Sequence, residues 1–474
     1  MSLIKYQIIG LLSFALLAGC GGGSSSEGQS NTGTNSNTGT NSDTGSTSNT
    51  GGSQQVDTTA PVITLNGEAN VTAIMQQGYQ ELGAVAVDEV DGVLPVTISH
   101  DLDLTKEGEY TVTYSATDKS GNQASLQRMV RVVEAKRLAD VIADDAFLQC
   151  ALDAGYTYAF EVDELSCVNK GITSVQGIEY LVAIKKLVLL NNLLTEIDVS
   201  KNTQLQQLDV AFNQLSNLDV SNNVTLVKLD AYCNKLSNLD VSNNVTLVEL
   251  YAFTNKLSNL DVSNNVILVE LGVSSNKLDS IDVSNNLGLR RLALGSNQLQ
   301  NVDLSQNTAL EELSVELNQL TELDLSHNEK LKSLWAFGNN ISHIDLSKHS
   351  ELEQLNIESN MLTDIVLTNN VLLEWLALSD NPLTFVDLSK NDKLWSVSIA
   401  ETNLSDLDIR SNTQLRWLDL TANSLTAIDV RQNLVLETLR LEGNQLLEID
   451  LTMNNKLTEV LLDEGVTCSG QACP

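Results

Sequence analysis

The sequence predicts a mainly β protein whose larger part is a solenoid of short repeated coils, preceded by a β-sandwich and a disordered segment. Leu and Asn recur with one fixed period from residue 184 onward, as the spacing of Asn192, Asn213 and Asn234 shows. Short alternating apolar and polar runs fill residues 58–134, whereas residues 20–57 are mostly Gly, Ser, Thr and Asn. At 474 residues the chain exceeds what one compact core usually absorbs, so several structural units are expected.

The charge balance narrows the classes of partner. Acidic residues outnumber basic ones by 61 to 27, which gives a formal net charge of -34. Such a surface repels nucleic-acid phosphates and anionic membrane surfaces, so nucleic acid is not expected as a partner. Membrane contact is expected only through an attached lipid.

The N-terminus has the pattern of an export signal. Lys5 precedes an apolar run, residues 8–17, that is too short to span a bilayer, so residues 1–19 are predicted to be a signal peptide. The run ends in LAGC, which resembles the lipobox of bacterial lipoproteins and implies acylation of Cys20. By that resemblance, Gly rather than Asp at position 21 implies retention in the outer membrane rather than the inner membrane. The protein is then expected to face either the cell surface or the periplasm. An ordinary signal peptide with an incidental cysteine is the alternative.

Residues 20–57 carry almost no apolar side chain and cannot bury enough surface to offset chain entropy. They are predicted to form a disordered tether with a root-mean-square reach of roughly 30 to 37 Å.

Residues 58–134 predict a β-sandwich of immunoglobulin-like type. Tyr110, Val112 and Tyr114 alternate with polar residues, and turn signals fall at Asn66-Gly67, Asp91-Gly92 and Gly121-Asn122. The segments PVITLNG, ELGAVAVDEVDG and GEYTVTYSATDKSGN resemble bacterial immunoglobulin-like domains, which implies a spacer role.

Three acidic residues of this module are candidate Ca²⁺ ligands, since that ion takes several oxygen ligands. They are Asp88, Asp91 and Asp118. The favoured alternative is that these carboxylates cap turns. No other metal and no cofactor is expected.

From residue 183 to 460 the pattern L-x-x-L-x-L-x-x-N recurs in thirteen coils. Its Asn runs from Asn192 to Asn444, and Thr402 is the one break in that column. A repeat of this length and signature predicts a leucine-rich-repeat solenoid, in which stacking of the coils supplies the core. The Asn column is predicted to be structural, because its amides can pair with backbone groups of neighbouring coils.

Each coil has a strand whose side chains alternate. In residues 229–234, Leu229 and Ala231 point inward, whereas Asp230 and Tyr232 point outward on the concave side. A second outward column, from Asp198 to Asp450, carries Asp in twelve of thirteen coils. Like charges about 5 Å apart need backbone N–H partners or a cation, and local bonding is favoured over a Ca²⁺ ladder.

The 21-residue unit, with its LDVSxN segment, resembles the short repeats of bacterial surface proteins of the internalin J type. This resemblance spans nearly all of the repeat array and implies an adhesive role. That group carries a stacked cysteine at the second inward strand position. Here the column holds other apolar residues, among them Val210, Ala231, Ala252, Val273 and Leu294.

Five cysteines remain after Cys20, and pairing is expected in an exported chain. Cys150 and Cys167 are predicted to bridge a small helical N-terminal cap in residues 135–182. Cys468 and Cys473 are predicted to close the tail, residues 461–474. Cys233 is expected to lie outside both disulfides.

No catalytic motif is found, and the four histidines have no metal spacing, so the chain is not expected to be an enzyme. The three coils that start at Leu215, Leu236 and Leu257 are near copies that differ mainly on the concave strand. This favours ligand binding there, although tolerance of strand positions would also explain it.

Outward aromatic residues strengthen the hypothesis because they mark contact sites for proteins and glycans. Packing against neighbouring turns is the alternative for the last three tryptophans. The candidate ligand-binding residues are Asp230, Tyr232, Tyr251, Phe253, Trp335, Phe337, Trp375, Trp395 and Trp417. The sequence thus predicts a monomeric surface lipoprotein that binds a protein or glycan; an envelope-organising protein without a specific ligand is the alternative.

Overall fold

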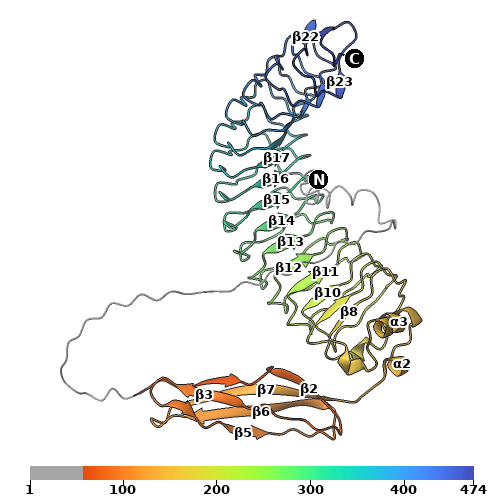
Figure 1. Ribbon diagram of the computed structural model, residues 1–474, viewed down its shortest axis with the longest axis vertical. Coiled ribbons are helices and arrows are strands. Elements are labelled where there is room, and N and C mark those ends of the chain that lie inside the picture. The colour runs from red at the N-terminus through yellow and green to blue at the C-terminus, as the bar shows by residue number, and fades with distance from the viewer. Residues whose placement is uncertain (1–56, 474) are drawn as a thin grey trace, which may run out of the picture. The chain divides into compact units, whose positions relative to one another are not determined.

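The computed structural model describes residues 57–473 (Figure 1). The predicted signal peptide, the predicted acylation site Cys20 and residues 20–56 of the predicted tether lie outside the described residues. The described chain divides into two units between Lys136 and Arg137, and each is described by itself. Within residues 57–473, no helix has the length and apolar character needed to cross a membrane.

The first unit is the predicted immunoglobulin-like sandwich. One sheet has the antiparallel order β1-β3-β4 and the other has the order β2-β7-β6-β5, in which β2 runs parallel to β7. Val112, Tyr114, Val130 and Val132 project from β6 and β7 into the buried core. The strands are β1 (Val62–Leu65), β2 (Asn70–Ile74), β3 (Ala84–Asp88), β4 (Gly92–Leu94), β5 (Thr97–His100), β6 (Gly108–Thr117) and β7 (Gln123–Val133).

The predicted turns of this module fall where glycine is needed. Gly67, Gly92 and Gly121 have φ values of 89°, 74° and 93°, in the left-handed region that other residues rarely adopt. Gly67 lies between β1 and β2, Gly92 begins β4, and Gly121 lies between β6 and β7.

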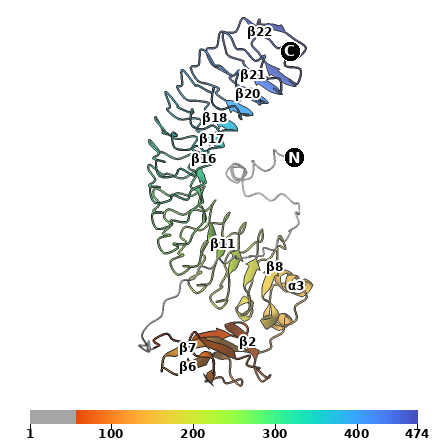
Figure 2. The ribbon, with the colours of Figure 1, turned by 60° about the vertical axis from the view of Figure 1, so that its left-hand side comes forward.

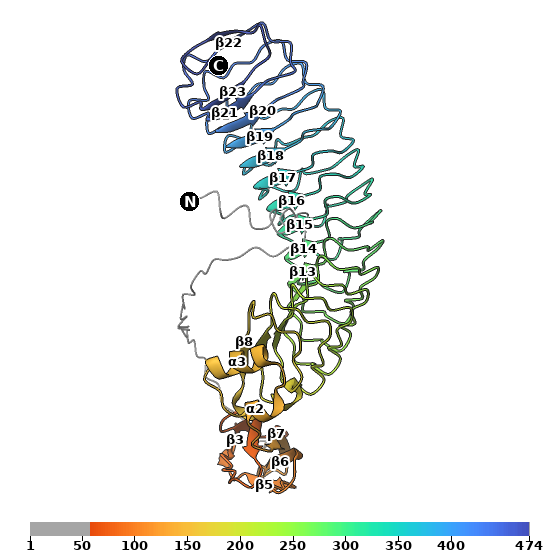
Figure 3. The same ribbon diagram turned by 90° about the vertical axis from the view of Figure 1, so that its right-hand side faces the viewer.

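The second unit is the predicted solenoid, built on a 15-stranded parallel sheet. Its strands line the concave side of the curved stack (Figures 2 and 3). They are β8 (Glu164–Ser166), β9 (Lys186–Val188), β10 (Gln207–Asp209), β11 (Lys228–Asp230), β12 (Glu249–Tyr251), β13 (Glu270–Gly272), β14 (Arg291–Ala293), β15 (Glu312–Ser314), β16 (Ser333–Trp335), β17 (Gln354–Asn356), β18 (Trp375–Ala377), β19 (Ser396–Ser398), β20 (Trp417–Asp419), β21 (Thr438–Arg440) and β23 (Glu459–Leu461).

The register of this sheet follows the repeat. Leu229 pairs with Leu250, and Leu250 pairs with Leu271, so each strand lies one repeat period from the next. These leucines are at most 1% exposed and form one continuous core. The sheet extends one strand beyond the thirteen predicted coils at each end, into β8 of the predicted cap and into β23.

Two columns of asparagine tie each coil to the one before it. Asn234 donates from Nδ2 to the Val210 carbonyl at 2.9 Å, and its Oδ1 accepts the Leu215 N–H at 2.9 Å. In the second column, Asn223 donates to the carbonyls of Val199 and Asn202 at 3.0 and 2.9 Å. The structural role predicted for the first column is confirmed.

Both ends of the solenoid are closed by separate elements. The N-terminal cap comprises α2 (Leu138–Val141), α3 (Asp145–Asp153), and the 3₁₀ turns η1 (Ala159–Glu161) and η2 (Ile178–Tyr180), and its apolar residues join the solenoid core. At the other end β22 (Glu448–Asp450) pairs with β24 (Thr467–Ser469). The predicted disulfides Cys150–Cys167 and Cys468–Cys473 are both present.

Candidate binding surface

The first group of candidate residues forms a continuous aromatic cluster on the coils with strands β10 to β12. Tyr232 and Phe253 stack with their ring centroids 4.3 Å apart. Phe212 meets Tyr232 edge-on at 5.4 Å, and Tyr251 meets Phe253 edge-on at 6.3 Å. Such arrangements suit the quadrupoles of the rings and hold them in fixed positions. We call Phe212, Tyr232, Tyr251 and Phe253 the aromatic cluster.

Gly272 makes room for this cluster. A Cβ on Gly272 would lie 2.9 Å from Cδ1 of Tyr251 and 3.4 Å from Cδ1 of Phe253. The rings of Tyr251 and Phe253 thus occupy the space that a side chain at position 272 would need. Two partners hold Tyr251 further: its hydroxyl donates to Glu270, and Lys228 Nζ lies 5.1 Å from its ring centroid.

Charged side chains surround the aromatic cluster. Lys228 Nζ lies 2.7 Å from a Glu249 carboxylate oxygen and 3.7 Å from one of Asp230. Burial raises the pKa of Asp230 to about 7; Lys228 opposes this rise, and the nearby carboxylates of Asp209 and Glu249 add to it. Asp230 therefore exchanges a proton near neutral pH, at the edge of the aromatic cluster.

A second group of candidates lies on later coils. The rings of Trp335 in β16 and Trp375 in β18 stack across the intervening coil, with centroids 5.2 Å apart. Trp335 Nε1 donates to the Ser333 hydroxyl at 2.9 Å, which fixes the indole. Phe337 is half-buried two residues further along the same coil. We call Trp335 and Trp375 the tryptophan pair.

Trp395 and Trp417 do not take part in this stack. Trp417 begins β20 and receives the Arg440 guanidinium 5.8 Å from its ring centroid. Arg440 also lies 2.8 Å from Glu459 and 3.6 Å from Asp419. Trp395 is half-buried directly before β19. The packing alternative thus applies to Trp417, whereas Trp375 belongs to the tryptophan pair.

Two residues of this surface were missed by sequence reasoning. Phe212 occupies the turn position before Asn213, which the repeat pattern treats as a connector, and its φ of 51° turns the ring toward Tyr232. Gly272 has no side chain to attract notice. A comparison of side-chain size between equivalent positions of neighbouring coils would have pointed to both residues.

The Asp column on the opposite half of the coils makes local hydrogen bonds to the backbone. The Oδ1 of Asp219 accepts the Ser221 N–H at 2.9 Å, and hydrogen bonds from the Ser221 side chain and backbone lower its pKa. The same local bond recurs along the column, as expected for Asx-type turns. Its other members are Asp198, Asp240, Asp261, Asp282, Asp303, Asp324, Asp345, Asp387, Asp408, Asp429 and Asp450.

The remaining predicted residues are Cys233 and the three candidate Ca²⁺ ligands, and only two of those ligands lie together. Cys233 is buried and in no disulfide, at the turn beside the aromatic cluster. Asp91 accepts from both the backbone and Nζ of Lys119, at 2.7 and 2.9 Å. Asp88 and Asp118 do converge, but their third neighbour is Asp57 and not the predicted Asp91. Asp57 was missed because it lies at the border of the predicted tether.

Comparison with known proteins agrees with this architecture. Residues 63–132 match the family model of a bacterial surface protein immunoglobulin-like domain. The chain is 32% identical to the functional domain of InlJ from Listeria monocytogenes, with a TM-score of 0.60. The match covers 70% of this chain and 71% of that one. No curated protein matches the chain.

Two further solved structures share the fold. A Leptospira interrogans leucine-rich-repeat protein is 23% identical with a TM-score of 0.56, covering 60% of this chain and 78% of that one. An internalin, InlF, from Listeria monocytogenes is 21% identical with a TM-score of 0.51, covering 71% and 93%. These identities support the solenoid fold only.

The immunoglobulin-like module and the repeat array together define a leucine-rich-repeat protein of the bacterial surface class. Because the likeness to InlJ extends over most of both chains, this chain belongs to the internalin family of such proteins. Its solenoid departs from the cysteine ladder of InlJ, since the second inward strand position carries Val210, Ala231 and Ala252. Folds of this family are typically those of binding proteins rather than enzymes.

Proposed function

We propose that the chain is a surface recognition protein that binds a protein or glycan partner through the concave face of its solenoid. The observation that supports this most directly is the aromatic cluster, in which four rings contact one another on the strand face and its adjoining turn. Phe212 is 36% exposed, Tyr232 and Tyr251 are half-buried, and Phe253 is buried at 8% exposed. The first three rings therefore offer the accessible area, which a partner can cover at low entropic cost. The tryptophan pair adds a second such surface on the same sheet.

The chemistry around the aromatic cluster favours a protein partner with exposed basic side chains. Asp209, Asp230, Glu249 and Glu270 lie on four consecutive strands, and Lys228 and Arg291 neutralise them only in part. A lysine or arginine of the partner would meet both carboxylates and ring faces there. A glycan would instead stack on the tryptophan pair.

Binding to protein and glycan arrays tests the proposal, using the chain with Cys20→Ser so that it carries no lipid. We expect the Tyr251→Ala/Phe253→Ala variant to lose at least tenfold in affinity for the captured protein. Trp335→Ala is expected to do the same for a glycan. Phe385→Ala is the matched control, because its ring is 67% exposed outside the strands. Equal affinity of all variants would refute the concave-face assignment.

The proton on Asp230 gives this binding a pH signature. A basic partner prefers the ionised carboxylate, so its affinity is expected to fall as the pH drops through about 7, where Asp230 takes up a proton. Asp230→Asn should bind more weakly at pH 8 and show a flatter profile between pH 8 and 6. A wild-type profile that is flat across that range would exclude this role for Asp230.

We further propose that Cys20 is acylated and holds the protein at the outer membrane, with the solenoid facing outward. The LAGC motif supports this, although it lies outside the described residues. Labelling with a radioactive fatty acid should mark the wild-type chain and not Cys20→Ser. Protease shaving of intact cells should remove the solenoid. A protected solenoid would favour the alternative, an envelope-organising lipoprotein without a specific ligand.

A further inference from the structure

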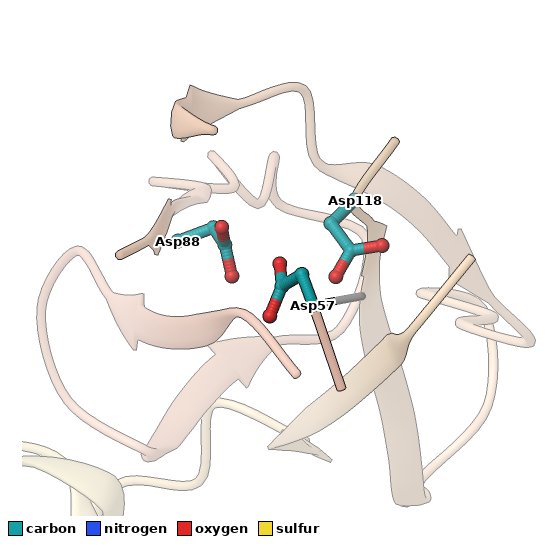
Figure 4. A group of neighbouring side chains, drawn as sticks. All are labelled: Asp57, Asp88 and Asp118. Carbon is teal, nitrogen blue, oxygen red and sulfur yellow. The ribbon is translucent and has the colours of Figure 1, made fainter. Parts of the chain in front are cut away.

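Three carboxylates from distant parts of the sequence converge at one end of the immunoglobulin-like module. Asp57 precedes β1, Asp88 is the last residue of β3, and Asp118 directly follows β6. One carboxylate oxygen from each lies within 4.8 Å of the others. Figure 4 shows the three side chains facing one another. We call Asp57, Asp88 and Asp118 the aspartate triad.

The triad holds buried oxygen atoms that the turns do not use. Asp88 is 3% exposed; its Oδ1 accepts the N–H groups of Val90 and Asp91 at 2.9 and 2.8 Å. Its other oxygen, Oδ2, is buried without a hydrogen-bond partner among residues 57–473. Asp57 repeats the arrangement, because Oδ1 accepts the Thr59 N–H at 3.0 Å and the buried Oδ2 has no such partner. Turn capping therefore accounts for only half of each carboxylate.

Asp118 is 6% exposed and is positioned by Asn122. The Asn122 N–H donates to Oδ1 at 2.8 Å, and its side-chain amide donates to Oδ2 at 2.7 Å. The same amide reaches the Asp57 carbonyl at 3.1 Å, so Asn122 links two members of the triad.

The salt bridges of residues 57–136 involve other carboxylates of the module, namely Glu81, Asp91, Asp103, Glu109 and Glu134. The nearest cation along the chain, Lys119, directs its Nζ to Asp91 at 2.9 Å and is 80% exposed. Three carboxylates at this separation, partly removed from water, repel one another strongly unless a positive charge lies between them. An unpaired buried carboxylate oxygen costs further free energy.

We infer that the aspartate triad is a Ca²⁺ site. The donors are all oxygen, which suits a hard cation and not zinc, and Ca²⁺ accepts mixed protein and water ligands in flexible geometry. The free Oδ2 atoms of Asp57 and Asp88 supply two ligands, an oxygen of Asp118 supplies a third, and water completes the shell. The ion fastens the segment before β1 to the ends of β3 and β6, and so stiffens the point where the chain enters the module.

Isothermal titration calorimetry with CaCl₂, on the whole chain carrying Cys20→Ser, tests the inference. We expect one saturable Ca²⁺ site per chain and slower hydrogen exchange at residues 57–62, 88–92 and 118–122 when Ca²⁺ is bound. Asp57→Asn and Asp88→Asn should each weaken binding at least tenfold. Asn keeps the turn-capping Oδ1, and Asp57 lies outside every strand, so neither variant should unfold.

Two control variants locate the site. Asp103→Asn alters a turn carboxylate of the same module, and Asp219→Asn alters the Asp column of the solenoid; both should leave Ca²⁺ affinity unchanged. The absence of saturable heat, or equal affinity in wild type and Asp57→Asn, would overturn the inference. Loss of binding in Asp219→Asn would overturn it as well, because it would move the ion to the solenoid. Mg²⁺ is expected to compete at least tenfold less well, since it demands a rigid octahedral shell.

Discussion

Arg128 shows how much a single residue can organise within the immunoglobulin-like module. Its guanidinium is 1% exposed and pairs with Glu81, and it also donates to the backbone carbonyls of Glu68 and Asn66 at 2.9 and 2.6 Å. Burial raises the pKa of Glu81, but hydrogen bonds from Tyr114, its neighbours and Arg128 lower it overall to about 2. A buried charge is tolerated here because each of the three guanidinium nitrogens donates to an acceptor.

Replacing Arg128 by Met should destabilise the module by about 3 kcal/mol, because it leaves Glu81 and two carbonyls without their donors. Hydrogen exchange of residues 58–134, followed by mass spectrometry, measures this change. Lys106→Met is the control, since Lys106 is 76% exposed and pairs with Asp103 at 3.5 Å; its effect should stay within about 0.5 kcal/mol. Similar exchange rates in both variants would show that the buried pair adds little.

At the scale of one coil, the turn before each first-column Asn imposes a left-handed residue. Glycine occupies this position at Gly338 and Gly443, whereas Phe212, Cys233 and Thr254 adopt φ values of 50° to 54° without it. Such a conformation costs on the order of 1 kcal/mol for a residue with a Cβ. The hydrogen bonds of the Asn side chain to the preceding coil offset this cost, because the turn places the amide where it can make them.

The second Asn column has one exception, His349, which is 1% exposed. Burial lowers the pKa of its imidazole, so the folded state resists protonation. The contribution to stability is therefore complete above about pH 6.5, and it is lost as the pH falls below that unfolded-state value. The solenoid should be acid-sensitive at this coil.

His349→Asn should remove this sensitivity to acid, because an amide does not titrate and Asn is the residue that the other coils carry at this position. Urea unfolding followed by tryptophan fluorescence suits the measurement, because all four tryptophans lie between residues 335 and 417. Between pH 6.5 and 5.5, the free energy of unfolding of the wild type should fall by up to about 1.4 kcal/mol more than that of the variant. His327→Asn, at an exposed position, serves as the control. Equal losses in wild type and His349→Asn would rule out the imidazole as the cause.

At the scale of the whole solenoid, stability depends on closing both ends of the stack. Each coil contacts only its neighbours, so an unprotected end frays inward. The two cysteines of the Cys150–Cys167 bridge are 17 residues apart in the sequence, and those of the Cys468–Cys473 bridge are 5 residues apart. Loop-closure entropy gives about 3 kcal/mol for the first and about 2 kcal/mol for the second.

Removal of each bridge by double serine substitution should therefore have a local and unequal effect. Cys150→Ser/Cys167→Ser should speed hydrogen exchange in residues 138–190, and Cys468→Ser/Cys473→Ser should do so in residues 441–473. The central coils around β14 should exchange at wild-type rates in both variants. Faster exchange along the entire sheet would contradict a nearest-neighbour stack.

The amino-acid sequence alone was enough to predict the solenoid, because one constant repeat period places the same inward leucines and the same Asn in each coil. It also determined the cap and tail disulfides and the local bonding of the Asp column, which depend on neighbours close in sequence or one period apart. The contacts between side chains on the surface became visible only in the folded chain. Phe212 joined the aromatic cluster, Trp335 stacked on Trp375 across a coil, and Asp57 replaced Asp91 beside Asp88, because such contacts depend on curvature and rotamers that no repeat pattern encodes.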